Sequence, residues 1–267
     1  MIALFLAAGL AQACTPPDGV SQLWERSERI IVVGESHGTR EGPAAFAEIV
    51  CAATEQGPVT VALELPSNMQ PSLNAFLAAA DATTALEALE GTPFLAPRMA
   101  DGRTSESMLD MLNRIRTLRT EGRDVAIHAF QPNASRPRDW PQAWYELDMA
   151  ANMAAAVYQR PTGRVLALVG NLHARNTAIE RLPEVGLPAA AHLPAQDTLT
   201  VVIAQQGGEA WNCQEECGPH TQGARYDPDA RGVILEPYAE GAYDAVLALG
   251  PSTASPPIQA QAPTVSD

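Results

Sequence analysis

Short apolar runs alternate with longer amphipathic segments through the first two thirds of this chain. Four such runs stand at Ile30 to Val33, residues 59–63, residues 125–127 and residues 165–169. Short runs rich in β-branched residues, without polar alternation, are typical of strands buried on both faces of a parallel sheet. We therefore predict an α/β fold with a mainly parallel central sheet flanked by helices, and extra edge strands near the C-terminus.

The segments between the runs have the apolar spacing of helices that pack on such a sheet. In residues 105–121, for example, Met111, Ile115 and Leu118 belong to one stripe, while arginines occupy the opposite face. Residues 91–103 lack this spacing and contain several Gly and Pro. We interpret them as a surface connection, with a lid over the strand ends as the alternative. Helices are expected at 22–29, 42–56, 68–89 (broken near Asp81), 105–121, 141–159 and 174–182, and later strands at 199–204, 232–235 and 243–249.

The two ends of the chain differ from this pattern. Residues 1–13 are almost wholly apolar and end in Ala11-Gln12-Ala13, which is typical of a secretory signal peptide and its cleavage site. This run is shorter than the roughly 20 residues that a membrane span needs. We therefore predict an exported protein, periplasmic or secreted, with no membrane insertion after signal removal. Residues 20–250 form a single domain in this interpretation, and the Pro-, Ser- and Ala-rich residues 251–267 form a disordered tail.

The four cysteines fit an exported protein, because export permits disulfides. Cys213 and Cys217 are expected to close a local loop, with a zinc knuckle that includes His220 as the alternative. Cys51 lies on an apolar helical face and is interpreted as a small buried hydrophobe. Cys14 follows the predicted cleavage site, so an outer-membrane lipoprotein anchored there is a second possibility. It is disfavoured because Ala11 stands where a lipobox has Leu.

Composition narrows the possible partners. The net charge is −14, whereas a protein that binds phosphate backbones or anionic membranes needs clustered Lys and Arg. Nucleic acid is thereby disfavoured as a partner. A small-molecule or peptide substrate is compatible with the composition.

Polar residues follow the apolar runs at the point where each predicted strand ends. Glu35 and His37 follow the first run, Glu64 the second, and Gly170-Asn171-Leu172-His173 the last of the four. The carboxyl ends of parallel strands share one edge of the sheet, which is where ligands bind in open α/β folds. We therefore expect these side chains to converge, although the first and the last are far apart in sequence.

Two imidazoles and a carboxylate are the ligands of zinc-like and manganese-like metals in hydrolytic sites. His37, His173 and either Glu35 or Glu64 supply these atoms, and the remaining carboxylate then serves as general base. In the metal-free alternative, His37 is the base, oriented by a Glu. His128 is as readily a core histidine as a site residue.

The strand-end motifs resemble those of the superfamily that joins erythromycin esterases, ChaN-type haem-uptake lipoproteins and Tiki/TraB proteins. The likeness lies in two Gly-x-x-His motifs, residues 34–37 and 170–173, with Glu64 between them. Met149-Ala150-Ala151-Asn152 also resembles the Met-Ala-x-Asn helix of that superfamily, but Tyr145-Glu146 stands where Arg-Asp usually precedes it. The Glu-x-His spacing is closer to the ChaN and Tiki type than to erythromycin esterases.

The resemblance implies an α/β sheet with a site at its rim, on which members act as esterases, metal-dependent peptidases or haem binders. Our first hypothesis is an exported, metal-assisted hydrolase that acts on an ester or amide bond of a small molecule or peptide. The alternative is a non-catalytic haem- or metal-binding envelope protein, with Tyr145, Tyr158 or a site histidine as axial ligand. The candidate cofactor-binding residues are Asn171, His128 and Tyr145.

Overall fold

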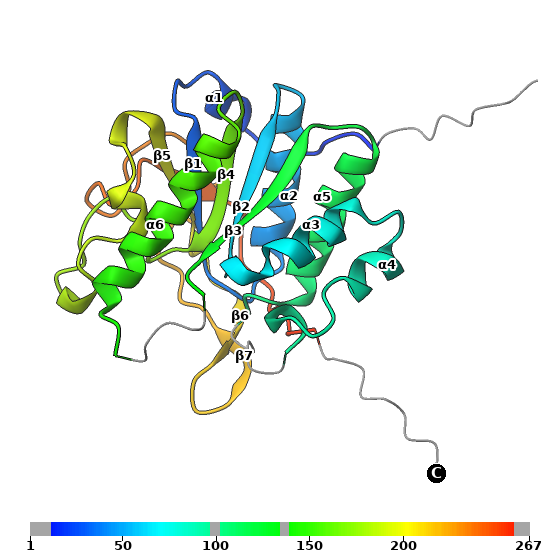
Figure 1. The fold of residues 1–267 in the computed structure, drawn as a ribbon. Helices are drawn as coiled ribbons and strands as arrows, with labels where there is room; N and C mark the ends of the chain where they lie inside the picture. Colours follow the sequence, from blue (N-terminus) through cyan, green and yellow to red (C-terminus); the bar gives the residue numbers. More distant parts are fainter. Residues whose placement is uncertain (1–11, 97–101, 134–138, 259–267) are drawn as a thin grey trace, which may run out of the picture.

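The computed structural model describes residues 12–96, 102–133 and 139–258. A seven-stranded sheet in the order β3-β2-β4-β1-β5-β9-β8 forms the centre (Figure 1). Every pairing in it is parallel except that of β8 with β9. The predicted α/β class is confirmed, and the antiparallel strand lies at an edge. The strands are β1 (Ile30–Glu35), β2 (Val59–Pro66), β3 (Val125–Gln131), β4 (Arg164–Gly170), β5 (Thr198–Ile203), β8 (Gly232–Ile234) and β9 (Ala245–Ala248).

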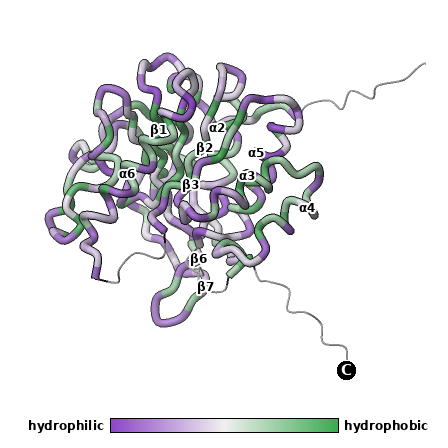
Figure 2. Tube along the Cα trace, in the orientation of Figure 1, coloured by the Kyte–Doolittle hydropathy of each residue, from purple (hydrophilic) through white to green (hydrophobic). Residues whose placement is uncertain are grey.

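Helices cover both faces of this sheet, so its strands are buried from either side. Side chains of β1 alternate: Ile31 and Val33 belong to the core beneath α2, α3 and α5, whereas Ile30 and Val32 belong to the core beneath α6. Figure 2 shows the hydrophobic trace concentrated in these interior strands. This double burial explains why the strands read as uninterrupted apolar runs. The helices are α1 (Ser21–Trp24), α2 (Glu41–Thr54), α3 (Gln70–Ala78), α4 (Ala82–Glu87), α5 (Glu106–Thr120) and α6 (Gln142–Gln159), with 3-10 turns at Ser67–Met69, Pro93–Leu95, Pro183–Val185, Ala189–His192 and Ala195–Asp197.

Several predicted helices have different bounds in the structure. The first is reduced to the four residues of α1. The break near Asp81 is confirmed, because its side chain accepts a hydrogen bond from the backbone N–H of Thr84 and so caps α4. The helix expected at 174–182 is wrong. The backbone N–H of Asn176 bonds to the carbonyl of Ala242 instead, and no helix N-terminus follows the second Gly-x-x-His motif.

A separate antiparallel hairpin, β6 (Glu209–Cys213) and β7 (Cys217–Thr221), projects from the body of the fold (Figure 1). The predicted disulfide between Cys213 and Cys217 joins its two strands. The alternative zinc knuckle is wrong, since both sulfurs are bonded to each other and His220 Nε2 contacts the carbonyl of Glu216.

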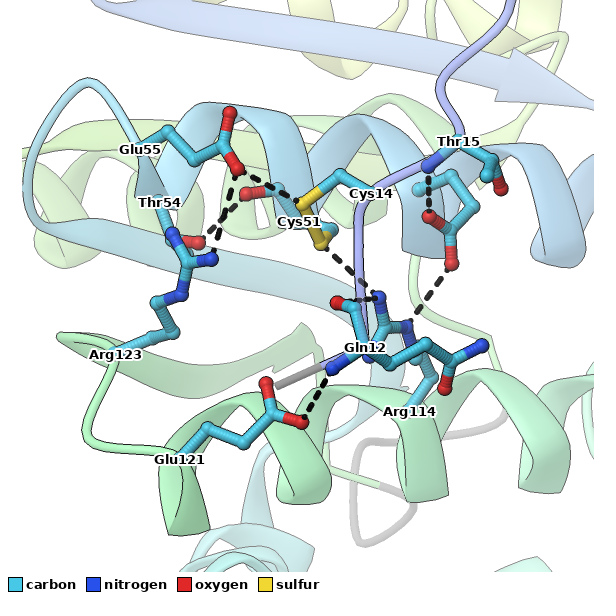
Figure 3. Close-up of a disulfide and its surroundings, with 10 residues drawn as sticks. Gln12, Cys14, Thr15, Cys51, Thr54, Glu55, Arg114, Glu121 and Arg123 are labelled. Atoms are coloured by element: carbon cyan, nitrogen blue, oxygen red, sulfur yellow. Dashed lines mark hydrogen bonds and ion pairs between the residues drawn. A yellow bond between two sulfur atoms is a disulfide. The ribbon is translucent and has the colours of Figure 1, made fainter. Parts of the chain in front are cut away.

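The interpretation of Cys51 as a plain hydrophobe is also wrong, because it forms a disulfide with Cys14 (Figure 3). The chain around Cys14 lies across α2 and α5, where Thr15 N–H donates to Glu48 and Arg114 bonds both Glu48 and the Cys51 sulfur. A thiol joined in a disulfide cannot also carry a lipid thioether, so this pairing and a lipid anchor at Cys14 exclude each other. Most of the predicted signal peptide, residues 1–11, lies outside the described residues. No helix in the described part is long and apolar enough to cross a membrane.

Residues 251–258, expected to begin a disordered tail, pack against the domain instead. Ser255 is fully buried, its N–H donates to the carbonyl of Gly38, and its hydroxyl accepts from Ser107 N–H. Thr253 accepts from the backbone N–H of Arg40. The segment is held by backbone hydrogen bonds rather than by an apolar stripe, so the sequence carries no periodic signal of its order. Residues 259–267 lie outside the described part of the chain.

The two disulfides differ in the length of chain that they close, 37 residues for Cys14–Cys51 and 4 residues for Cys213–Cys217. Loop-closure entropy gives about 4 kcal/mol of stabilisation for the longer loop and about 2 kcal/mol for the shorter one. We expect a Cys14→Ala/Cys51→Ala variant to lose more unfolding free energy in urea than a Cys213→Ala/Cys217→Ala variant does. Equal losses in the two pairs would contradict this ranking.

Candidate active site

Residues from three neighbouring strands meet at one edge of the sheet. Strand β4 lies between β1 and β2, so its exit is flanked by the exits that carry His37 and Glu64. His37 Nε2 lies 3.4 Å from Glu64 Oε2, and His173 Nε2 lies 3.9 Å from Glu64 Oε1. The structure thus brings together the two Gly-x-x-His motifs and the intervening Glu, as the strand pattern predicted.

Glu64 is at the centre of this cluster and is only 6% exposed. Its Oε2 accepts a hydrogen bond of 2.8 Å from the backbone N–H of Gly170, and Arg103 lies 3.5 Å from its Oε1. A buried carboxylate needs partners of this kind, because its desolvation costs several kcal/mol. Two imidazoles, a guanidinium and a backbone N–H supply them.

Glu35 and His37 form the first of two Glu–His pairs. The Nδ1 atom of His37 lies 3.0 Å from Glu35 Oε1, so this nitrogen donates and Nε2 faces Glu64. Glu35 is 4% exposed, and its Oε2 has no hydrogen-bond partner among the described residues. A carboxylate in this position fixes the tautomer and the orientation of the imidazole.

Glu146 and His173 form the second pair, and the sequence interpretation did not include Glu146 in the site. His173 Nδ1 lies 2.7 Å from Glu146 Oε2, which also accepts from the backbone N–H of Ala189 at 3.0 Å. Gln142 donates to the other carboxylate oxygen. Glu146 comes from α6 and is fully buried. A signal was present, because Glu146 stands where the motif that this helix resembles carries Asp.

Arg103 is the second residue that the sequence interpretation missed. It is the last residue of the breaker-rich loop 91–103, whose residues 97–101 lie outside the described part. Its guanidinium reaches Glu64, so the end of this loop does lie over the strand exits. Nothing in the sequence distinguishes this arginine from a solvated one.

Two glycines are required by the packing of the site. A side chain at Gly170 would place its Cβ 3.0 Å from His37 Nε2 and 3.5 Å from both Glu64 and His173. Gly38 has a φ of 77°, and a Cβ there would lie 2.0 Å from the carbonyl oxygen of Trp211. Gly170 therefore makes room for the two histidines, and Gly38 makes room for the hairpin.

The other predicted residues have different positions. Asn171 lies at the site, where its N–H bonds to the carbonyl of Glu35 and it lines the same cleft. Tyr145 packs edge-on against the ring of His173, and its hydroxyl accepts from Gln131. His128 is not brought to the cluster: it lies within β3 and contacts the backbone carbonyl of Asn152 on α6.

The charges of the cluster shift its pKa values in opposite directions. Burial disfavours the charged form of His37, but the attraction of Glu64 and the bond to Glu35 outweigh it and raise the pKa of His37 to about 10. Burial also disfavours ionised Glu64, yet His37, His173 and Arg103 together lower the pKa of Glu64 to about 2. The pKa of His173 is raised, since the bond to Glu146 and the charge of Glu64 outweigh its burial. Burial raises the pKa of Glu35.

A cleft of about 340 Å³ opens directly on these groups. His37 and His173 both line it, with side chains 24% and 16% exposed. Asn212 and Gln222, from the hairpin region, form the facing wall. A small molecule entering the cleft therefore reaches both imidazoles.

A metal ion in a hydrolytic site needs about three converging protein ligands. Within residues 12–96, 102–133 and 139–258, no group of three His, Cys, Asp or Glu side chains is arranged to hold one. Both carboxylate oxygens of Glu64 already face donors, and one of these donors, Arg103, is itself a cation. As arranged, these residues do not fit a metal, and the chemistry below is derived without one.

The His37–Glu64 pair makes stability depend on pH. The pKa of His37 rises from 6.5 to about 10, so its contribution is complete below pH 6.5 and is lost as pH rises through 10. The pKa of Glu64 falls from 4.5 to about 2, so its contribution is complete above pH 4.5 and is lost as pH falls through 2. We therefore compare the unfolding free energy of the protein with that of its Glu64→Gln variant by urea titration. The difference in favour of the unsubstituted protein should be largest between pH 4.5 and 6.5. A difference independent of pH would refute this account of the pair.

The fold, rather than the sequence, relates this chain to known structures. The sequence matches no protein-family model and no curated protein. A variant of the erythromycin esterase EreC, in its open conformation, covers 85% of this chain and 91% of its own at a TM-score of 0.64 and 14% identity. A Bacillus cereus protein covers 87% and 91% at a TM-score of 0.61 and 13% identity. A succinoglycan biosynthesis protein covers 86% and 89% at a TM-score of 0.54 and 10% identity. The chain therefore shares the mixed α/β fold of the erythromycin esterase structure.

Proposed function

We propose that this protein is an exported hydrolase that cleaves an ester or amide bond of a small molecule or peptide by general-base catalysis. The observation that carries the proposal is the pair of Glu–His contacts, Glu35–His37 and Glu146–His173, that face one carboxylate at an open cleft. The likeness to an erythromycin esterase structure supports the reaction class. It does not extend to the macrolide, because the Glu-x-His spacing departs from that of these esterases.

His37 is the proposed general base. Glu35 holds its Nδ1, so the lone pair of the neutral ring is on Nε2, and His37 lines the cleft. The separation of 3.4 Å between Nε2 and Glu64 is long for a hydrogen bond, which leaves Nε2 available to a water molecule. Nε2 takes a proton as the water oxygen bonds to the carbonyl carbon. The same proton then passes to the departing alcohol or amine as its bond to that carbon breaks.

His173 and Arg103 are the proposed sources of positive charge for the transition state. Both face Glu64 Oε1, whereas His37 faces Oε2, and the ring of His173 is oriented by the fully buried Glu146. Negative charge develops on the carbonyl oxygen as water adds, and fixed positive groups nearby lower that barrier. Glu64 keeps these cations and His37 within one small region.

The metal and haem hypotheses stay predictions, and no described contact favours either of them. For haem, Tyr145 is buried and bonded to Gln131, and Tyr158 is 83% exposed, away from any described partner. Metal analysis of the purified protein and a haemin titration followed in the Soret band test the two hypotheses. Export is supported by the two disulfides, which form in oxidising compartments.

Hydrolysis of 4-nitrophenyl acetate tests the proposed roles directly. We expect His37→Asn and His173→Asn to lose about 100-fold or more in kcat/KM, the usual range for a positioned acid or base. Both variants should keep the circular dichroism spectrum of the parent. His192→Asn, at an exposed histidine that ends the 3-10 turn Ala189–His192, is the control.

Two results would argue against the proposal. Full activity in both histidine variants would remove the general-base role. Loss of activity after dialysis against EDTA, with recovery on adding zinc or manganese, would replace the metal-free mechanism by the metal-assisted one.

The pH dependence of kcat/KM tests His37 as the base. With its pKa raised to about 10 by Glu64, the neutral form is scarce near neutrality, so the rate should rise with pH up to that value. In Glu64→Gln the attraction is gone, the pKa of His37 falls, and the rise should occur at lower pH. Identical profiles for the two proteins, measured by pH-stat titration, would show that another group carries the proton.

A further inference from the structure

A second cavity of about 340 Å³ adjoins the active-site cleft. Asn171 and Leu172, which lie between Gly170 and His173, line both cavities. The two spaces thus share part of the second Gly-x-x-His motif as a common wall. A ligand lying across Asn171 and Leu172 occupies both.

Three arginines, Arg175, Arg181 and Arg225, line this second cavity, which we name the arginine pocket. Its described lining contains no acidic residue, although the chain has 31 acidic and 17 basic residues. None of the three forms an ion pair with any residue in the described part, whereas other arginines, such as Arg114 and Arg123, do. The pocket is therefore a local excess of positive charge in an acidic protein.

Arg175 is the arginine best fixed in place. Its guanidinium lies over the ring of Tyr243, 5.5 Å from the centroid, and the Tyr243 hydroxyl donates to the backbone carbonyl of Asn171. Its Nε is buried and has no hydrogen-bond partner among the described residues. Arg175 also lines the pocket, where an anion would accept charge-assisted hydrogen bonds from its guanidinium. The chain of contacts Arg175–Tyr243–Asn171 also ties the pocket to the strand exit that carries His173.

The remaining wall is aromatic and aliphatic. Tyr238 stacks on Tyr243 at 6.4 Å between ring centroids, and Ile179 and Leu182 line the same space. Such a wall accepts the apolar body of a ligand whose charged end contacts the arginines.

We propose that the arginine pocket binds an anionic group, a phosphate, sulfate or carboxylate, on the substrate whose ester or amide bond lies at His37. The identity of the ligand as substrate rests on the proposed function, whereas the binding of an anion does not. The substrate class is then an ester or amide with an anionic group on the part that extends past Asn171 and Leu172.

Calorimetric titration of the full chain with phenyl phosphate tests the pocket without any turnover. The ring matches the tyrosine wall and the phosphate matches the guanidinium groups. We expect saturable binding that weakens about tenfold or more in Arg181→Gln/Arg225→Gln, as for loss of charge-assisted hydrogen bonds. Both of these arginines are exposed, so the variant should fold normally. Arg123→Gln removes the same charge from the opposite edge of the sheet and should bind as the parent does.

Matched esters test whether the bound anion is substrate. We expect kcat/KM to favour mono-4-nitrophenyl glutarate over 4-nitrophenyl acetate, and this preference to fall about tenfold in Arg181→Gln/Arg225→Gln. An unchanged preference in that variant overturns the proposal. The proposal is also overturned if the parent does not bind phenyl phosphate. It is overturned likewise if His37→Asn loses this binding while Arg181→Gln/Arg225→Gln keeps it. Arginine-dependent binding without hydrolysis of either ester supports the pocket and counts against the hydrolase.

Discussion

The burial of one ionised carboxylate, that of Glu64, is the constraint on which the site depends. A charge at the end of an apolar strand is tolerated only if partners replace the water it has lost. His37, His173, Arg103 and the N–H of Gly170 are those partners, and they come from segments up to 109 residues from Glu64 in sequence. The hydrogen bonds and opposite charges that buried Glu64 requires therefore set the positions of the cationic groups. Two further carboxylates, those of Glu35 and Glu146, contact the Nδ1 atoms of the two histidines and fix the orientation of the imidazole rings.

The part of this arrangement that could be predicted is the part that the strands impose. Apolar runs identify strands, and parallel strands that lie side by side deliver their next residues to a common edge. Glu64, His37 and His173 could therefore be placed together before the fold was known. The sheet was predictable for the same reason, since burial from both faces leaves a signal along each strand that needs no knowledge of its neighbours.

The groups that were missed are those whose position depends on packing between distant elements. Glu146 lies on a helix, where a polar residue ordinarily faces solvent, and only the approach of α6 to the β4 exit turns it inward. Arg103 ends a loop without periodicity. Cys14 pairs with Cys51 because the N-terminal segment crosses α2, which no local pattern encodes. The helix expected at 174–182 is absent, and the backbone N–H of Asn176 instead donates to the carbonyl of Ala242.

The segment at 252–255 has a consequence for how this protein can be handled. It is hydrogen-bonded to Gly38 and Arg40, in the segment that follows His37, and so helps to hold His37 in place. Trimming the chain after the last strand, a common step in crystallisation work, would remove these hydrogen bonds while leaving the sheet intact. A shortened protein would then keep the circular dichroism spectrum of the folded chain while the imidazole of His37 is misplaced.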